Sequence, residues 1–149
     1  MARGAARKYD AGAAAFFLEN LCQDVDLILR FGFALALDEG KAQKLVKKTY
    51  ASIVSEIPEL LDLESTKIRL RLLRRAWELF HEEPEEGVSH THVSDLLRDL
   101  DLATRSSLFL VDVFGLTFEE AREITKMDDA ELRHYLAKGR KKLLRFRFD

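Results

Sequence analysis

The chain has 149 residues, of which 47% are hydrophobic and 34% are charged. This length suits one domain or two very small ones, and the composition is typical of a soluble, helix-rich protein. The net charge is −2, divided into +2 over residues 1–80 and −4 over residues 81–149. Because neither part is a bulk polycation, any contact with nucleic acid must come from local clusters of basic side chains.

The apolar runs and the cysteine content indicate a cytoplasmic protein. The longest apolar runs, residues 11–18 and 31–37, fall short of the ~20 residues that a membrane-spanning helix needs. The basic start, residues 1–10, has no convincing cleavage site after it, so we expect a loose N-terminal tail. The single cysteine, Cys22, cannot form an internal disulfide, which fits a reducing compartment. We therefore expect no membrane partner.

The first part of the chain predicts two helices. Apolar residues recur at helical spacing from Phe17 to Leu29, and Gly32 and residues 38–40 interrupt the pattern that follows. A second helix is predicted over residues 41–55, where apolar side chains form a continuous stripe. Its other side carries Lys41, Lys44, Lys47 and Lys48. This lysine row is either a solvated helix face or a contact surface for another protein.

A third long helix is predicted from Ser65 to Phe80, after Pro58 ends or restarts the helical pattern. Its apolar side chains form a broad arc that includes Trp77, which we expect in the core. The opposite side collects four basic residues, Lys67, Arg71, Arg74 and Arg75. This basic row is either a solvated face or a contact with phosphates, since cations aligned along two turns match a nucleic-acid backbone.

Residues 81–92, HEEPEEGVSHTH, have the composition of a linker. They divide the chain into a front domain, residues 10–80, and a back domain, residues 93–149. We interpret His90 and His92 as linker histidines, because no nearby cysteine or spaced acidic set completes a tetrahedral metal site. We therefore expect no bound metal.

The predicted fold class is all-α, with two small helical domains. Few stretches alternate with period two, and only Pro58 and Pro84 could break a helix. The chain has no phosphate-cradling glycine loop, nucleophile elbow or catalytic dyad. We therefore expect no enzyme activity and no cofactor.

Residues 115–140 carry the most informative functional pattern. Thr117 with Glu120, and Asp128 with Glu131, both fit the capping box, in which each helix start is stabilised by reciprocal hydrogen bonds. Small and apolar residues follow each box at helical spacing. Two capped helices this close together predict a helix-turn-helix, which can present its second helix to a groove of DNA.

This segment resembles region 4 of a bacterial sigma factor of the extracytoplasmic-function type. The segment aligns without a gap to the family pattern, which reads G-L-S-Y, E-I-A, a turn, S-x-G-T-V-K-S-R-L and a basic A-R ending. Upstream, the family's L-P-x-R corresponds to residues 102–105. Glu131, His134 and Tyr135 stand where the family has Thr, Ser and Arg, and Lys126 replaces the turn glycine. The matching positions are Gly115, Leu116, Thr117, Phe118, Glu120, Ile124, Leu132, Leu136 and Arg140.

The front part resembles region 2 of the same family. There a helix reading A-E-D-L-V-Q-E-T-F contacts the polymerase clamp, and residues 42–50, AQKLVKKTY, keep its apolar letters. Lys44, Lys47 and Lys48 replace polar or acidic letters, so this surface would repel a basic partner. Residues 75–77 are similar to the family's R-A-W element. The two resemblances follow the family's order, with a linker between them.

The resemblance implies a regulator of transcription initiation that binds core RNA polymerase and promoter DNA. The implied protein-contact residues are Lys44, Lys47, Lys48 and Tyr50. The implied DNA-binding residues are Lys67, Arg71, Arg74, Arg75, Arg133, Lys138, Arg140 and Lys141. A second hypothesis is a diverged sigma mimic that binds an anti-sigma factor or another protein instead of DNA. In that case the residues of the hydrophobic core match the family, whereas the polar surface residues have been replaced.

Overall fold

The computed structural model describes residues 15, 19, 21–82 and 93–148. Every regular element within these residues is a helix, so the all-α prediction is confirmed. Among the described residues, no helix combines the length and the apolar character needed to cross a membrane. The expected N-terminal tail and most of the expected linker lie outside the described residues.

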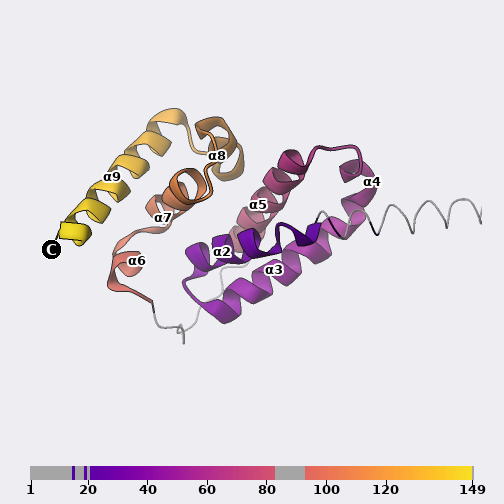
Figure 1. Ribbon diagram of the computed structural model, residues 1–149, viewed down its shortest axis with the longest axis horizontal. Helices are drawn as coiled ribbons and strands as arrows, with labels where there is room; N and C mark the ends of the chain where they lie inside the picture. Colours follow the sequence, from indigo (N-terminus) through magenta and orange to yellow (C-terminus); the bar gives the residue numbers. More distant parts are fainter. Residues whose placement is uncertain (1–14, 16–18, 20, 83–92, 149) are drawn as a thin grey trace, which may run out of the picture.

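Three long helices make up the front part of the chain, residues 21–82, and pack against one another (Figure 1). They are α2 (Val25–Ala36), α3 (Glu39–Ile53) and α5 (Ser65–Glu82). The 3₁₀ turn η1 (Val54–Glu56) and the short helix α4 (Ile57–Leu60) connect α3 to α5. Pro58 lies in the first turn of α4, where its missing N–H removes no intrahelical hydrogen bond. The proline therefore restarts the helical path.

The first helix differs from its prediction. We expected an interruption at Gly32, but α2 continues through it to Ala36, and Leu37 then adopts a left-handed conformation with a φ of 53°. Gly32 lies where α2 passes close to α3, since a Cβ there would be 3.3 Å from the Cα of Ala42. The glycine therefore permits close helix packing instead of ending a helix. Part of the expected apolar stripe, residues 16–18, lies outside the described residues.

The predicted linker begins later than expected, because α5 includes His81 and Glu82. The Nδ1 atom of His81 is 2.8 Å from the carbonyl oxygen of Trp77, and the centroids of the two rings are 4.2 Å apart. These contacts, made one helical turn apart, stabilise the end of α5. The rest of the expected linker, residues 83–92 with both of its histidines, is outside the described part of the chain.

The back of the molecule contains short helices followed by one long helix. They are α6 (Asp95–Asp99), α7 (Leu102–Leu108), the π-helical turn η2 (Phe109–Val113), α8 (Phe118–Thr125) and α9 (Asp129–Phe148). Helix α9 packs along α7. In Figure 1, α9 forms the outer edge of the molecule, on the far side of α7 and α8 from α5.

Both predicted capping boxes are present. The Thr117 hydroxyl accepts from the Glu120 N–H at 3.1 Å, and the Glu120 carboxylate accepts from the Thr117 N–H at 2.9 Å. The corresponding distances for Asp128 and Glu131 are 2.7 Å and 3.2 Å. Each box provides acceptors for N–H groups that a helix start leaves without intrahelical partners. The starts of α8 and α9 are therefore encoded within a few residues.

The turn between α8 and α9 passes through Lys126, which has a left-handed φ of 63°. The sigma-factor pattern has glycine here, and a residue with a Cβ carries a steric cost of about 1–2 kcal/mol in this conformation. We predict that Lys126→Gly raises the free energy of unfolding by about 1 kcal/mol in urea denaturation. Lys126→Ala is the control, because it removes the amine and keeps the Cβ. A glycine variant no more stable than the alanine variant would contradict the prediction.

The front and back of the molecule share one hydrophobic core. The ring of Phe31 on α2 is 6.4 Å from that of Trp77 on α5 and 6.2 Å from that of Phe114, which follows η2. One cluster of buried apolar side chains extends from Leu21 to Leu136. Helix α8 packs on α5, and α7 packs on α2. The sequence left open whether the two parts contact each other, and the structure answers that they do.

Arg105 also joins the two parts. It is the residue that aligns with the arginine of the family's L-P-x-R. Its guanidinium donates hydrogen bonds to the carbonyl oxygens of Ala34, Leu35 and Leu100, the last two at 3.1 Å and 2.6 Å. Only 7% of Arg105 is exposed. Ala34 and Leu35 belong to the last turn of α2, which has no basic residue of its own. A side chain of the back half therefore supplies the donors for the C-terminus of a front helix.

Candidate nucleic-acid and partner interfaces

The basic row of α5 contacts acidic side chains of its own and neighbouring elements. The ion pairs are Arg75–Glu56 at 2.8 Å, Arg71–Glu56 and Arg71–Glu59 at 3.5 Å, and Arg74–Glu78 at 3.0 Å. The arginine side chains remain 30–50% exposed, and ion pairs this exposed contribute about 0–1 kcal/mol each. A phosphate can therefore displace a carboxylate here, but it has to compete with one.

A groove of about 360 Å³ lies between α5 and α8 and has opposite charges on its two walls. Lys67, Arg71 and Arg74 line the α5 side, and Glu119, Glu120 and Glu123 line the α8 side. Glu120 is held in place by its capping box. The predicted DNA-binding face of α5 therefore lies opposite the three carboxylates of α8. Their negative potential opposes the approach of a phosphate.

Two basic residues of α9 that were predicted to bind DNA form ion pairs with carboxylates of the same chain. The Nζ of Lys138 is 2.6 Å from a carboxylate oxygen of Asp101, and the Arg140 guanidinium donates to both carboxylate oxygens of Asp112, at 2.9 Å and 2.7 Å. Burial alone would raise the pKa of Asp101, but hydrogen bonds from Lys138 and Thr104 lower it to about 2. The hydrogen bond from Arg140 likewise lowers the pKa of Asp112. These pairs attach α9 to the start of α7 and to η2.

The other two predicted DNA-binding residues of α9, Arg133 and Lys141, lie on its exposed face. Arg133 is 2.7 Å from the Asp129 carboxylate and 5.1 Å from the ring centroid of Phe118, while Lys141 lies two turns further along. Exposed residues recur along this face at helical spacing and comprise Ala130, Arg133, His134, Ala137 and Lys141. The acidic residues Asp128, Asp129 and Glu131 at the start of α9 favour the helix, but they would repel phosphates near that end.

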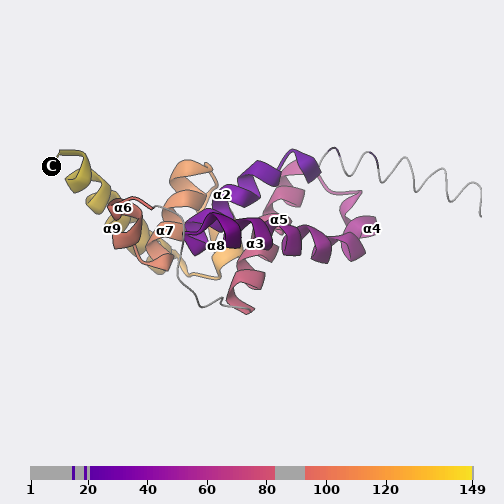
Figure 2. The ribbon, with the colours of Figure 1, turned by 90° about the horizontal axis from the view of Figure 1, so that it is seen from below.

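The structure does not gather the predicted DNA contacts into one surface. The basic row of α5 borders the groove toward α8, whereas α9 lies on the far side of α7 from α5 (Figures 1 and 2). Sequence reasoning missed the acidic partners Glu56, Asp101 and Asp112 and the role of Arg105. Periodicity within one helix could not reveal them, because each partner belongs to a different element.

The predicted protein-contact residues of α3 fall into two kinds. Lys44, Lys47 and Lys48 are exposed, whereas Tyr50 is half-buried. The Tyr50 hydroxyl donates a hydrogen bond to the carbonyl oxygen of Leu21 at 2.8 Å, and burial of the phenol raises its pKa. Tyr50 therefore holds the segment before α2 against α3, and the three lysines form the surface.

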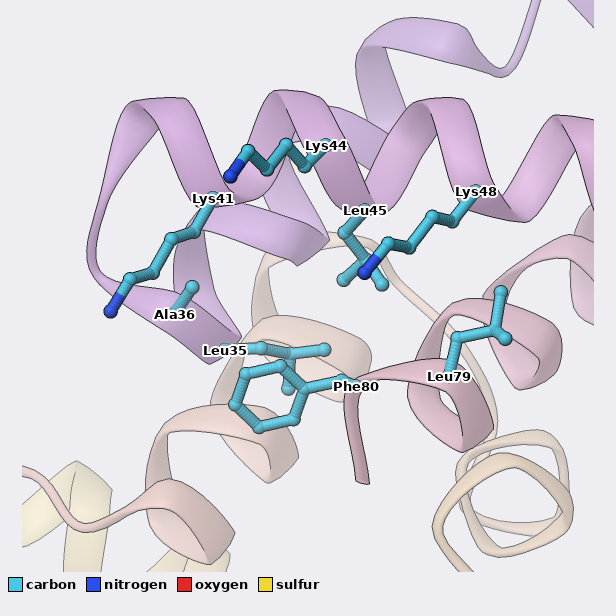
Figure 3. Close-up of a pocket in the computed structure, with 8 residues that line it drawn as sticks. All are labelled: Leu35, Ala36, Lys41, Lys44, Leu45, Lys48, Leu79 and Phe80. Carbon is cyan, nitrogen blue, oxygen red and sulfur yellow. The ribbon is translucent and has the colours of Figure 1, made fainter. Parts of the chain in front are cut away.

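Sequence reasoning also missed a pocket beside the lysines. Its volume is about 110 Å³, and it opens where α2, α3 and α5 meet (Figure 3). The lining residues are Leu35, Ala36, Lys41, Lys44, Leu45, Lys48, Leu79 and Phe80. The one available signal was the spacing of Lys41, Lys44 and Lys48, which places them on one side of α3. The apolar part of the pocket comes mainly from the other two helices, so only the folded structure reveals it.

Among the described residues, no group of histidine, cysteine, aspartate and glutamate side chains could hold a metal ion. Comparisons of the chain with protein-family models, with curated proteins and with solved structures find no match. The likeness to sigma factors therefore rests on the residues of this chain.

Proposed function

We propose that this chain is a sigma-factor-like regulator of transcription initiation that binds core RNA polymerase and promoter DNA in the cytoplasm. The observation that carries the proposal is the pair α8 and α9, in which two capping boxes flank a left-handed residue. This is the start, turn and restart that the region 4 pattern requires. The position of the pair after a three-helix front part, in the family's order, also supports this function.

In this proposal α8 and α9 form a helix-turn-helix, and the exposed face of α9 reads the distal promoter element. Arg133, His134 and Lys141 supply the polar contacts. The Arg133–Asp129 pair joins two side chains that are 65% and 51% exposed, so exchanging the carboxylate for a phosphate costs little. Lys138 and Arg140 act indirectly, because their ion pairs orient α9.

DNA binding is tested by fluorescence anisotropy with labelled promoter duplexes at several low salt concentrations. We predict that Arg133→Ala and Lys141→Ala each weaken binding and reduce the slope of log affinity against log salt by about 0.9 per lost phosphate contact. Lys47→Ala on α3 is the control, because it removes the same charge from a distant surface. If no duplex is bound even at the lowest salt, or if the control loses as much affinity, the DNA part of the proposal is wrong.

The charged groove supports a second prediction for the same assay. Replacing Glu119 and Glu123 with glutamine should strengthen DNA binding by about threefold to tenfold at low salt, because the α5 row then faces one carboxylate, that of Glu120, instead of three. The matched control is Asp95→Asn with Asp99→Asn on α6, which changes the net charge equally but away from the groove. Equal gains in both double variants would show that net charge matters and the groove does not.

The second candidate function is a diverged sigma mimic that binds an anti-sigma factor or another protein. One observation favours it: Arg74, Arg75, Lys138 and Arg140, which were predicted to contact DNA, form ion pairs with carboxylates of the same chain. Replacing Lys44, Lys47 and Lys48 with the acidic and amide residues of the family should then create polymerase binding where almost none existed. A wild-type chain that already binds polymerase and DNA would exclude the mimic.

A further inference from the structure

The groove between α5 and α8 carries opposite charges on its two walls, and the fold does not join them. Lys67 lies on the α5 wall, and Glu119 and Glu123 lie on the α8 wall. Among the residues that the structure describes, no ion pair includes any of these three side chains. All three are exposed. Their charges are therefore available to an occupant of the groove.

The other charged residues of the groove already have partners within the chain. Arg71 pairs with glutamates of η1 and α4, and Arg74 pairs with a glutamate of α5. The carboxylate of Glu120 belongs to the capping box of α8. One ammonium on one wall and two carboxylates on the other are thus the groups that remain for binding.

The floor of the groove is apolar. Helices α5 and α8 pack on each other (Figure 1), and each contributes an aliphatic side chain to the lining. Leu70 of α5 is half-buried, and Ile124 of α8 is only 1% exposed. The volume of the groove, about 360 Å³, is that of a small-molecule site. An occupant must therefore carry an apolar body between its charges.

The positions of the charges exclude an occupant of one sign. Glu119 and Glu123 are four positions apart, so their carboxylates lie one turn apart on the same side of α8 and can both accept from one ammonium group. Lys67 belongs to the other helix and can donate to an anion. A polyanion would be repelled by the α8 wall, and a polyamine would be repelled by the α5 wall.

We propose that this groove binds a small zwitterion in which several methylene groups separate an ammonium from a carboxylate, as in an ω-amino acid. The ammonium lies between Glu119 and Glu123, the carboxylate accepts from Lys67, and the methylene groups cover Leu70 and Ile124. The inference goes beyond the proposed function, because it requires neither polymerase nor promoter DNA.

The test is a nuclear magnetic resonance titration of the full chain with ε-aminocaproate. We expect saturable shifts of the backbone amides along both walls of the groove, with an affinity that falls as salt is added. Hexylamine and hexanoate are the matched probes, because each has an aliphatic chain of similar length but only one of the two charges. Both should bind at least tenfold more weakly, since each leaves one wall without a partner.

The length of the ligand tests the apolar floor without changing the protein. The zwitterion γ-aminobutyrate has the same two charged groups as ε-aminocaproate but two fewer methylene groups. It should bind about tenfold more weakly, because it buries less apolar surface and spans a shorter distance between the walls. Equal affinities of the two zwitterions would overturn the inference.

A variant of the α5 wall tests the carboxylate contact. Lys67→Gln should weaken ε-aminocaproate binding about tenfold and leave hexylamine binding unchanged, because hexylamine has no carboxylate. A merely structural role of Lys67 would affect both ligands equally. The control is Lys47→Gln on α3, which removes the same charge from a surface outside the groove and should change binding less than twofold.

A double variant of the α8 wall tests the ammonium contact. Glu119→Gln with Glu123→Gln should weaken ε-aminocaproate binding at least tenfold, whereas hexanoate should bind no more weakly than before. The control is Asp95→Asn with Asp99→Asn on α6, and thermal unfolding of each variant identifies losses caused by misfolding. Shifts that do not saturate, or a probe with one charge that binds as tightly as the zwitterion, would overturn the inference.

Discussion

Replacing Arg105 with methionine should lower the free energy of unfolding by about 3–5 kcal/mol. Methionine keeps an apolar stem of similar length but provides no donor, so three buried carbonyl oxygens lose a charged partner. Two of them end α2, where the helix dipole concentrates negative charge. Since whole domains are stable by only about 5–15 kcal/mol, a loss of this size is readily measured by urea denaturation.

The matched control is Arg133→Met, because Arg133 is exposed and its loss should change stability by about 0.5 kcal/mol or less. Arg105→Lys should fall between the two, since an ammonium group cannot reproduce the fork of donors that a guanidinium presents. If Arg105→Met cost no more than the control, water would be satisfying the carbonyls of α2. The contact between the two halves would then depend on the apolar core alone.

Replacing Gly139 with valine should cost about 2–3 kcal/mol. Gly139 is buried where α9 crosses α7, and a Cβ there would lie 2.5 Å from the Leu108 Cδ1 and 2.9 Å from the Thr104 Cγ2. Both neighbours are buried, so the helices must separate to admit the new side chain. The control is Ala137→Val on the exposed face of α9, where only helix propensity changes, by about 0.7 kcal/mol at most.

A double-mutant cycle shows whether the clash is the cause. Leu108→Ala removes the two closest atoms, so adding Gly139→Val to that background should cost clearly less than it costs alone. Thermal or urea unfolding of the four proteins gives the coupling. Additive losses would mean that the valine destabilises α9 for a reason other than its contact with Leu108, since valine favours a helix more than glycine does.

The sequence predicted most where the cause of a structure lies within a few neighbouring residues. Thr117 with Glu120 marks the start of α8 correctly, because the donors and acceptors of a capping box are three positions apart. The prediction at Gly32 was wrong, because packing of α2 on α3 outweighs the tendency of glycine to end a helix.

The candidate sites were harder to predict than the helices. The basic rows on α5 and α9 follow from helical periodicity, but their electrostatic state depends on carboxylates elsewhere in the chain. Arg75 pairs with Glu56 at a separation of 19 positions, and Lys138 pairs with Asp101 at a separation of 37. A pattern within one helix contains no information about such partners.

The sequence by itself determined that this protein is helical, where its last two helices begin, and which faces of its helices carry charge. These properties depend on hydrogen bonds and side-chain spacing within one or two turns. Only the tertiary structure decided that the two halves share a core, that Arg105 completes α2, and that lysines of α3 border an apolar pocket. The physical reason is that hydrophobic burial and ion pairing act between whichever side chains the fold brings together, whatever their distance along the chain.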